Sequence, residues 1–200
     1  MKVETLTVGR MEENCYLIID ENTNKAALID PGAGADYIAE KIEDYGVDLE
    51  AILLTHCHFD HNGAVDALKA KFDAEVYLNE AEAEYMNMDT SGLFTKLECK
   101  YKYVTEGENV TVGTLNFKPI FTPGHTVGGT CYLVEDKLFS GDTLFKGSIG
   151  RTDFPGGSFH DLINNIKNKL MILDNNVDVY PGHGDKSTIL EERNNNPFLA

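Results

Sequence analysis

The stretch Thr55-His56-Cys57-His58-Phe59-Asp60-His61 places three imidazoles and a carboxylate within six residues. Successive side chains of an extended chain point to opposite sides, so we expect His56, His58 and Asp60 to converge on one side. We expect His61 to project from the turn that begins the next helix. Imidazole and carboxylate ligands together suit Zn, Fe or Mn better than Ca or Mg. The stretch therefore predicts a transition-metal site.

Three further motifs each follow an apolar run and turn on Gly or Pro just where a polar side chain is presented. They are Thr122-Pro123-Gly124-His125, Ser140-Gly141-Asp142 and Tyr180-Pro181-Gly182-His183. With the first stretch they supply five His and two Asp, which is too many ligands for one tetrahedral zinc. Two metal ions that share one carboxylate would use the whole set and keep an open position for water. Such an open position is typical of catalytic sites.

The rest of the sequence alternates short β-rich runs with amphipathic helical patterns. The expected strands cover residues 3–8, 15–19, 26–29, 51–54, 75–78, 110–112, 115–121, 130–134, 137–139 and 177–180. The expected helices cover residues 35–45, 64–71, 80–88, 161–170 and 186–193, and residues 91–101 give no clear pattern. Because strands followed by helices occur twice, we expect an α/β (α+β) fold with a pair of sheets flanked by helices.

The chain has 200 residues, 42% of them hydrophobic, which is enough to build one domain over residues 1–200. Its 17 Lys and Arg against 33 Asp and Glu give a net charge of −16, which repels phosphate backbones and anionic membranes. We therefore expect neither nucleic acid nor a membrane as a partner. There is no secretion signal and no C-x-x-C pair among the four cysteines, so we expect a cytoplasmic protein with reduced thiols.

Taken in order, the motif residues resemble the metallo-β-lactamase superfamily, whose pattern is His-x-His-x-Asp-His, then a distant His, an Asp and a final His. The matching residues are His56, His58, Asp60, His61, His125, Asp142 and His183, and no member is missing. The resemblance covers nearly the whole chain. It implies a four-layer αββα sandwich with a two-metal site at one edge between the sheets.

The resemblance also implies which residues hold which ion. The first ion would be bound by His56, His58 and His125. The second would be bound by Asp60, His61 and His183. Asp142 would bridge the two ions. Asp30 matches an acidic turn residue of the family whose hydrogen bond orients a ligand His.

Within the superfamily, Gly141-Asp142-Thr143-Leu144-Phe145 and Pro181-Gly182-His183-Gly184 resemble the glyoxalase II group, the hydroxyacylglutathione hydrolases. Full-length members continue into a C-terminal helical domain that grips the thiol carrier, whereas this chain ends at Ala200. It is therefore similar to the short bacterial glyoxalase-II-like hydrolases, which share the stretches at residues 150–156 and 192–198. No extra helical domain is expected.

Two cations are candidates for substrate contacts. Arg151 aligns roughly with a lysine that meets the thiol carboxylate in the longer enzymes, and its alternative role is a buried ion pair with Asp153. Lys146 is a second candidate for the same contact. The expected substrate is thus a small anionic thioester. The sequence leaves the oligomeric state open.

The activity implied by the resemblance is metal-dependent hydrolysis of an S-2-hydroxyacyl thiol to a hydroxy acid and a thiol. A hydroxide bridging the ions would attack the thioester carbonyl, and Asp60 or Asp142 would direct the attacking proton. A thiol leaves as an anion with a pKa of about 8.5, so no separate general acid is required. Two zinc ions are expected, and Fe or Mn would accept the same ligands.

Two alternatives stay open. A persulfide dioxygenase would share the fold and the stretch Gly150–Phe154 but would use a single Fe. A metal-bound binding module without activity is the other alternative, although the complete ligand set argues against it. True β-lactamases of the superfamily carry a Cys where this chain has Asp60, which argues against that activity.

Overall fold

Strand β2 (Glu13–Asp20) is buried along its whole length and separates two apolar cores. Leu17 and Ile19 belong to a core that lies between the first sheet and its helices. Tyr16 and Ile18, on the opposite face, belong to a core that lies between two sheets. Because alternate side chains of a strand point to opposite faces, a strand that is buried at every position must be covered on both faces.

The computed structural model describes residues 1–200, and its first sheet has the order β1-β2-β3-β4-β5-β6. The strands other than β2 are β1 (Lys2–Val8), β3 (Lys25–Ile29), β4 (Asp48–Leu53), β5 (Glu75–Leu78) and β6 (Lys102–Tyr103). The first three strands pair antiparallel, and from β3 to β6 the pairing is parallel. Parallel neighbours need crossover connections, and α1 (Ala35–Tyr45) and α3 (Val65–Phe72) provide two of them.

The second sheet has the order β14-β13-β10-β9-β8-β7. Its strands are β7 (Val110–Val112), β8 (Leu115–Phe121), β9 (Thr130–Val134), β10 (Lys137–Gly141), β13 (Asp178–Pro181) and β14 (Ser187–Thr188). Strands β7 to β10 form an antiparallel meander, and β13 joins β10 in parallel. Both sheets therefore combine an antiparallel meander with a parallel strand that follows a helix. A separate hairpin pairs β11 (Leu144–Phe145) with β12 (Ser148–Ile149).

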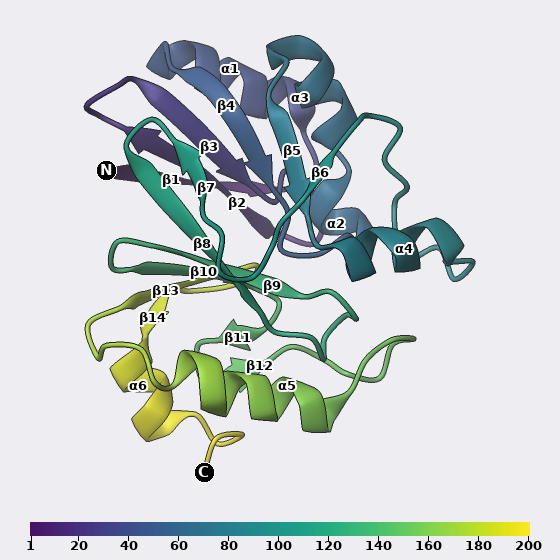
Figure 1. Ribbon diagram of the computed structural model, residues 1–200, viewed down its shortest axis with the longest axis vertical. Coiled ribbons are helices and arrows are strands. Elements are labelled where there is room, and N and C mark those ends of the chain that lie inside the picture. Colours follow the sequence, from purple (N-terminus) through teal and green to yellow (C-terminus); the bar gives the residue numbers. More distant parts are fainter.

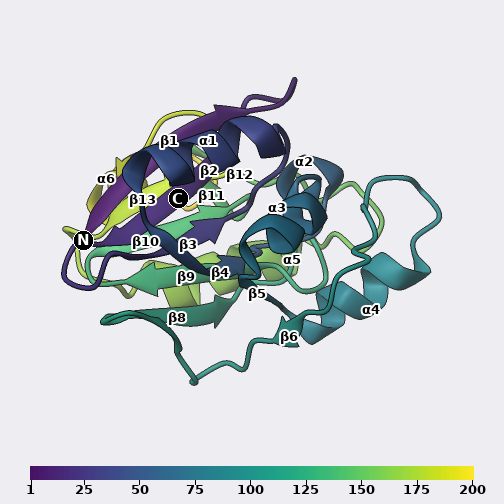
Figure 2. The ribbon, with the colours of Figure 1, turned by 90° about the horizontal axis from the view of Figure 1, so that it is seen from above.

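Helices cover the outer face of each sheet, as Figures 1 and 2 show. Helices α1 and α3 lie on the first sheet, while α5 (Phe159–Asn165) and α6 (Ile189–Asn195) lie on the second. Leu162 and Ile189 of the latter helices pack into a third core with residues of the second sheet. The predicted four-layer αββα sandwich is confirmed. None of the helices combines the length and apolar content needed to cross a membrane.

Helix boundaries differ from the prediction where side chains cap the helices. The helix expected at 161–170 begins at Phe159, because Ser158 Oγ accepts a hydrogen bond from the Asp161 N–H at 3.3 Å. Its second half, Ile166–Leu170, is π-helical. The helix expected at 186–193 begins only at Ile189, since the two residues before it pair with β13 as strand β14.

Several short elements were not expected, including strand β6. Helix α2 (Phe59–Asn62) occupies part of the metal-ligand stretch that the sequence predicted to be extended. The β11–β12 hairpin follows Asp142 directly. Helix α4 (Glu80–Met88) coincides with its prediction and begins at the capping side chain of Asn79.

Candidate metal centre

The predicted ligands lie where strands of both sheets end. His56 and His58 follow β4 of the first sheet, and α2 continues directly from them. His125, Asp142 and His183 follow β8, β10 and β13 of the second sheet. The two-sheet architecture therefore brings loops that are far apart in sequence to one edge of the sandwich. Strand ends of this kind are the usual location of binding sites in α/β folds.

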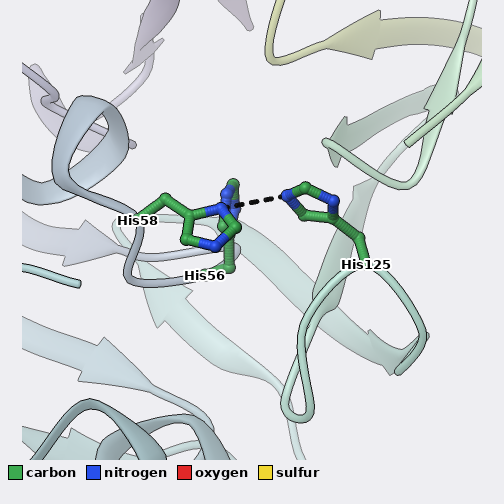
Figure 3. A group of neighbouring side chains, drawn as sticks. All are labelled: His56, His58 and His125. Carbon is green, nitrogen blue, oxygen red and sulfur yellow. Dashed lines mark hydrogen bonds between the residues drawn. The ribbon is translucent and has the colours of Figure 1, made fainter. Parts of the chain in front are cut away.

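One group of potential ligands consists of His56, His58 and His125, all of them buried. One ligand atom from each lies within 4.8 Å of the others. Figure 3 shows the three rings turned toward one another, with the His58 Nδ1 atom and the His125 Nε2 atom 3.1 Å apart. The group combines histidines from both sheets.

A second group consists of Asp60, His61 and His183. The His183 Nε2 atom lies 3.4 Å from the Asp60 Oδ2 atom. The expectation that Asp60 shares an extended segment with His56 and His58 is wrong, because Asp60 lies in helix α2. The helical turn instead directs Asp60 and its neighbour His61 to the same group.

Asp142 lies between the two groups. Its Oδ1 atom is 3.4 Å from the His61 Nε2 atom. Its Oδ2 atom is 3.7 Å from His125 Nε2 and 3.8 Å from His183 Nε2. A carboxylate in contact with both groups occupies the place that a bridging ligand requires. Close approach is possible because Gly182 has no side chain, since a Cβ there would lie 2.3 Å from Asp142 Oδ1.

Hydrogen bonds on the Nδ1 side hold the imidazole rings in place. His61 Nδ1 lies 3.1 Å from Asp30 Oδ2, and His125 Nδ1 lies 2.8 Å from the Arg151 carbonyl oxygen. His183 Nδ1 lies 3.1 Å from the carbonyl oxygen of Met11. Rings anchored through Nδ1 direct their Nε2 atoms into the centre, as is usual for metal-binding histidines.

The donor atoms that face the centre have no hydrogen-bond partners. They include His56 Nε2, His61 Nε2 and Asp142 Oδ1, and all of them are buried. Buried polar atoms are rarely left without partners in folded proteins. Three such atoms in one place, all of types that bind Zn, Fe or Mn, fit a divalent metal site.

The two groups differ in their electrostatics. Burial, reinforced by neighbouring imidazoles, lowers the pKa of His58 to about 3 and lowers the pKa of His56 and His125 as well. In the second group burial also acts to lower the pKa of His61, but the carboxylates of Asp142 and Asp30 raise it to about 10. The first group is therefore neutral and ready to coordinate a cation, while the second carries compensating charges.

Asp30 lies against the second group and hydrogen-bonds both His61 and Thr55. One of its oxygens accepts the backbone N–H of Thr55 at 2.7 Å, and the other meets both the Thr55 hydroxyl and the His61 ring. The backbone of Asp30 lies in the left-handed region, with φ at 50°. Few non-glycine residues adopt this conformation, so the carboxylate contacts must maintain it.

The loop that carries His183 is held by strand β2 of the opposite sheet. The Tyr16 hydroxyl donates to the Pro181 carbonyl at 2.6 Å, and the Asn14 side chain donates to the Gly184 carbonyl at 2.9 Å. Neither role was predicted from the sequence. The local signal was weak, because Asn14 is one of three polar residues in this fully buried strand, with Glu13 and Asp20.

A cleft of about 430 Å³ opens beside both groups. Its walls are largely apolar and are formed by Met11, Phe59, Leu93, Phe145, Ile149 and Phe154. Arg151 also lines it. A small molecule with an apolar portion can therefore lie against the proposed ligands.

The predicted substrate contacts lie at or near this cleft. Arg151 forms a two-pronged ion pair with Asp153, with both N–O distances 2.8 Å, and stacks over the Phe154 ring. Both members of the pair are exposed, which contradicts the alternative of a buried pair. Lys146 is not part of the cleft wall, and its amine lies 3.8 Å from Asp185.

Relatives of known sequence match over their full length. The chain is 36% identical to the "Probable metallo-hydrolase YqgX" of Bacillus subtilis and 35% identical to the "Hydroxyacylglutathione hydrolase GloC" of Haemophilus influenzae. Each alignment covers 100% of this chain and 98% of the relative.

Solved structures agree with the sequence comparison. The BLEG-1 B3 metallo-β-lactamase superposes with a TM-score of 0.91 at 35% identity, covering 100% of both chains. TTHA1623, solved in a di-iron-bound form, gives a TM-score of 0.88 at 34% identity and covers 98% of this chain and 100% of its own. ETHE1 from Myxococcus xanthus gives a TM-score of 0.85 at 32% identity. The match covers 98% of this chain and 84% of the ETHE1 chain.

A family model described as the metallo-beta-lactamase superfamily matches residues 8–183. This range contains both ligand groups, Asp142 and the strands that carry them. The fold, the site and the relatives lead to the same result: the chain belongs to the metallo-β-lactamase superfamily and is a metal-dependent hydrolase of that superfamily.

Proposed function

We propose that this protein is a glyoxalase-II-like thioesterase that uses two metal ions to hydrolyse a small thioester. The observation that carries the proposal is the place of Asp142, in contact with both ligand groups at the wall of an apolar cleft. The similarity to a hydroxyacylglutathione hydrolase over the full length of both chains supports the choice of a thioester.

The proposed ligands form two sets, one for each ion, and the sets correspond to the two groups described above. His56, His58 and His125 would hold one ion, and Asp60, His61 and His183 the other. Asp142 would contact both ions. When bound, the ions would activate water and polarise the substrate carbonyl. We propose zinc for both positions, and the di-iron form of TTHA1623 makes iron the first alternative to test.

The chain's own side chains would orient the substrate. The apolar cleft walls would bind the acyl group, and Arg151 at the cleft would contact a carboxylate of the thiol carrier after exchanging its exposed partner Asp153. Such an exchange costs little, because exposed ion pairs are weak. Lys146 has no comparable place in the cleft and is left out of this proposal.

Proton transfer would fall to a carboxylate. Asp60 or Asp142 would accept the proton of the attacking water at a carboxylate oxygen, since both lie at the edge of the cleft. The thiol needs no proton donor because it departs as a stable anion. Four unpaired cysteines support a cytoplasmic location for this activity, and the charge of −16 argues against nucleic acid or a membrane as partner.

The test is thiol release from S-2-hydroxyacylglutathione by wild type, Asp142→Ala and Asp20→Asn, with metal content measured on the same samples. We expect Asp142→Ala to lose metal and at least about a hundredfold in kcat, the scale of removing one stabilising group from an active site. Asp20→Asn is the control, because Asp20 lies at the end of β2 that is remote from the His183 loop. Unchanged turnover and metal content in Asp142→Ala would overturn the proposal.

A β-lactam and a persulfide complete the panel of substrates. The β-lactam is included because BLEG-1, a B3 metallo-β-lactamase, is similar over its full length. Oxygen uptake with the persulfide would indicate the dioxygenase alternative. Bound metal without any turnover would indicate a binding module.

A further inference from the structure

Glu82 is a buried carboxylate to which the proposed mechanism gives no role. It lies in the first turn of helix α4 and is only 1% exposed. Its Oε1 atom accepts a hydrogen bond from the Cys57 N–H at 3.0 Å, and its Oε2 atom accepts one from the Gly128 N–H at 2.8 Å. One side chain therefore contacts two separate loops.

These two loops carry the first ligand group. Cys57 stands between His56 and His58, and Gly128 is three residues after His125. The first loop follows a strand of the first sheet, and the second follows a strand of the second sheet. The distance between the loops is therefore set in part by a single carboxylate that reaches both.

The contact is close enough to leave little freedom. A Cβ atom at Gly128 would lie 2.5 Å from the Glu82 backbone nitrogen, so the loop rests directly against the start of helix α4. A backbone hydrogen bond of 2.9 Å from Thr130 to Thr55 joins the same two loops on another side. The helix and this bond together hold the loops at a fixed separation.

The chemistry of the contact specifies glutamate. Two N–H donors approach two different oxygens, and only a carboxylate offers an acceptor to each. A glutamine would turn its NH2 group toward one of the donors and leave that N–H without a partner. Burial raises the pKa of Glu82, and the hydrogen bonds from Cys57 and Gly128 oppose that shift.

We propose that Glu82 is a positioning residue that sets the separation of the His56–His58 loop and the His125 loop. The inference rests on the proposed metal site and adds what holds the two loops of its first group together. It predicts that loss of the carboxylate weakens metal binding more than it weakens the fold.

The test compares Glu82→Gln with Asp20→Asn. Asp20 also joins the two sheets, through Thr114, but it lies at the end of β2 that is remote from the proposed metal centre. The dissociation constant for Zn2+ is measured by competition with a chromophoric chelator, and the Co2+-loaded forms are compared by visible absorption. We expect Glu82→Gln to bind Zn2+ about tenfold to a hundredfold more weakly, with an altered Co2+ spectrum. Asp20→Asn should match wild type in both.

A second measurement needs no variant. Hydrogen exchange of the metal-free wild type should show the Cys57 and Gly128 amides protected, because both donate to Glu82 and neither bond involves a proposed metal ligand. Free exchange of these amides, or a Glu82→Gln variant that differs from wild type only in stability, would overturn the inference. A wild type that binds no Zn2+ would overturn the proposed function and this inference together.

Discussion

The two ends of strand β2 carry carboxylates in opposite situations. At one end, Asp20 accepts hydrogen bonds from the Asn22 N–H, the Thr23 hydroxyl and both the N–H and hydroxyl of Thr114, at 2.7 to 3.0 Å. At the other end, Glu13 is buried and neither of its carboxylate oxygens has a partner. Its nearest cationic group is His61, whose Nδ1 atom is 3.9 Å away.

The pKa values reflect this contrast. Hydrogen bonds from Thr23 and Thr114 lower the pKa of Asp20, whereas burial raises the pKa of Glu13 to about 10. The Asp20 end joins the two sheets through Thr114 and satisfies its polar groups within the chain. The Glu13 end lies at the proposed metal centre and leaves polar groups unsatisfied. We infer that the Asp20 end holds the two sheets together and that the polar groups at the Glu13 end are satisfied only when the proposed metal ions are bound.

Metal removal should produce the largest difference between the two ends. An ion present at about a thousand times its dissociation constant stabilises a fold by about 4 kcal/mol. Dialysis against a chelator should therefore lower the unfolding free energy by a similar amount. Hydrogen exchange should accelerate in the His183 loop and stay unchanged at Thr114. Equal acceleration at both ends would show that they are not independent.

The Asp20→Asn variant should produce the next largest effect, confined to stability. Because the native pKa of Asp20 lies below its unfolded value of about 3.9, its ionised form stabilises the fold above that pH. This contribution is lost as the pH falls through the native pKa. The urea midpoint of the variant should lie below that of wild type at pH 7, and the two midpoints should converge toward pH 2. Metal content should not change, and a loss of metal would contradict the assignment.

The Tyr16→Phe variant should have a smaller effect at the metal end. It removes the hydroxyl that donates to the Pro181 carbonyl, a bond worth about 1 kcal/mol. We expect a matching loss in unfolding free energy and weaker binding of the second metal ion, seen as a biphasic Zn2+ titration. Phe139 also stacks near Tyr180, so Phe139→Leu serves as a packing control. A Zn2+ titration like that of wild type would remove Tyr16 from this role.

The smallest effect on the fold is expected for Arg151→Gln. Its ion pair with Asp153 is exposed, so urea midpoints should stay within error of wild type. If Arg151 binds the carrier, KM should rise severalfold for a glutathione thioester and stay constant for an uncharged thioester with the same acyl group. The matched control is Lys146→Gln, which should change neither value. Equal KM changes for both substrates would exclude a charge contact.

The sequence predicted the candidate ligands and their grouping more completely than their surroundings. His125, Asp142 and His183 each follow a strand in a short local motif, so their positions and side-chain types could be read from the sequence. The place of Asp60 was not, because residue alternation cannot reveal that the chain turns into helix α2 at Phe59. The family pattern, which needs no backbone geometry, grouped it with His61 and His183.

The supporting residues were missed for a different reason. Tyr16 and Asn14 act on a loop about 165 residues later in the chain, and such pairings depend on how the two sheets pack. Glu82 lies four residues before the buried Met86, so only its helical position indicated that it faces inward. The exposure of the Arg151 pair likewise follows from tertiary packing.

Two metal ions are proposed to complete this edge of the sandwich for thioester hydrolysis. The most direct measurement is elemental analysis of the purified protein, with thiol release and persulfide-dependent oxygen uptake assayed on the same sample. We expect two metal ions per chain and thiol release from a thioester. One iron per chain with oxygen uptake, and no thiol release, would contradict this proposal.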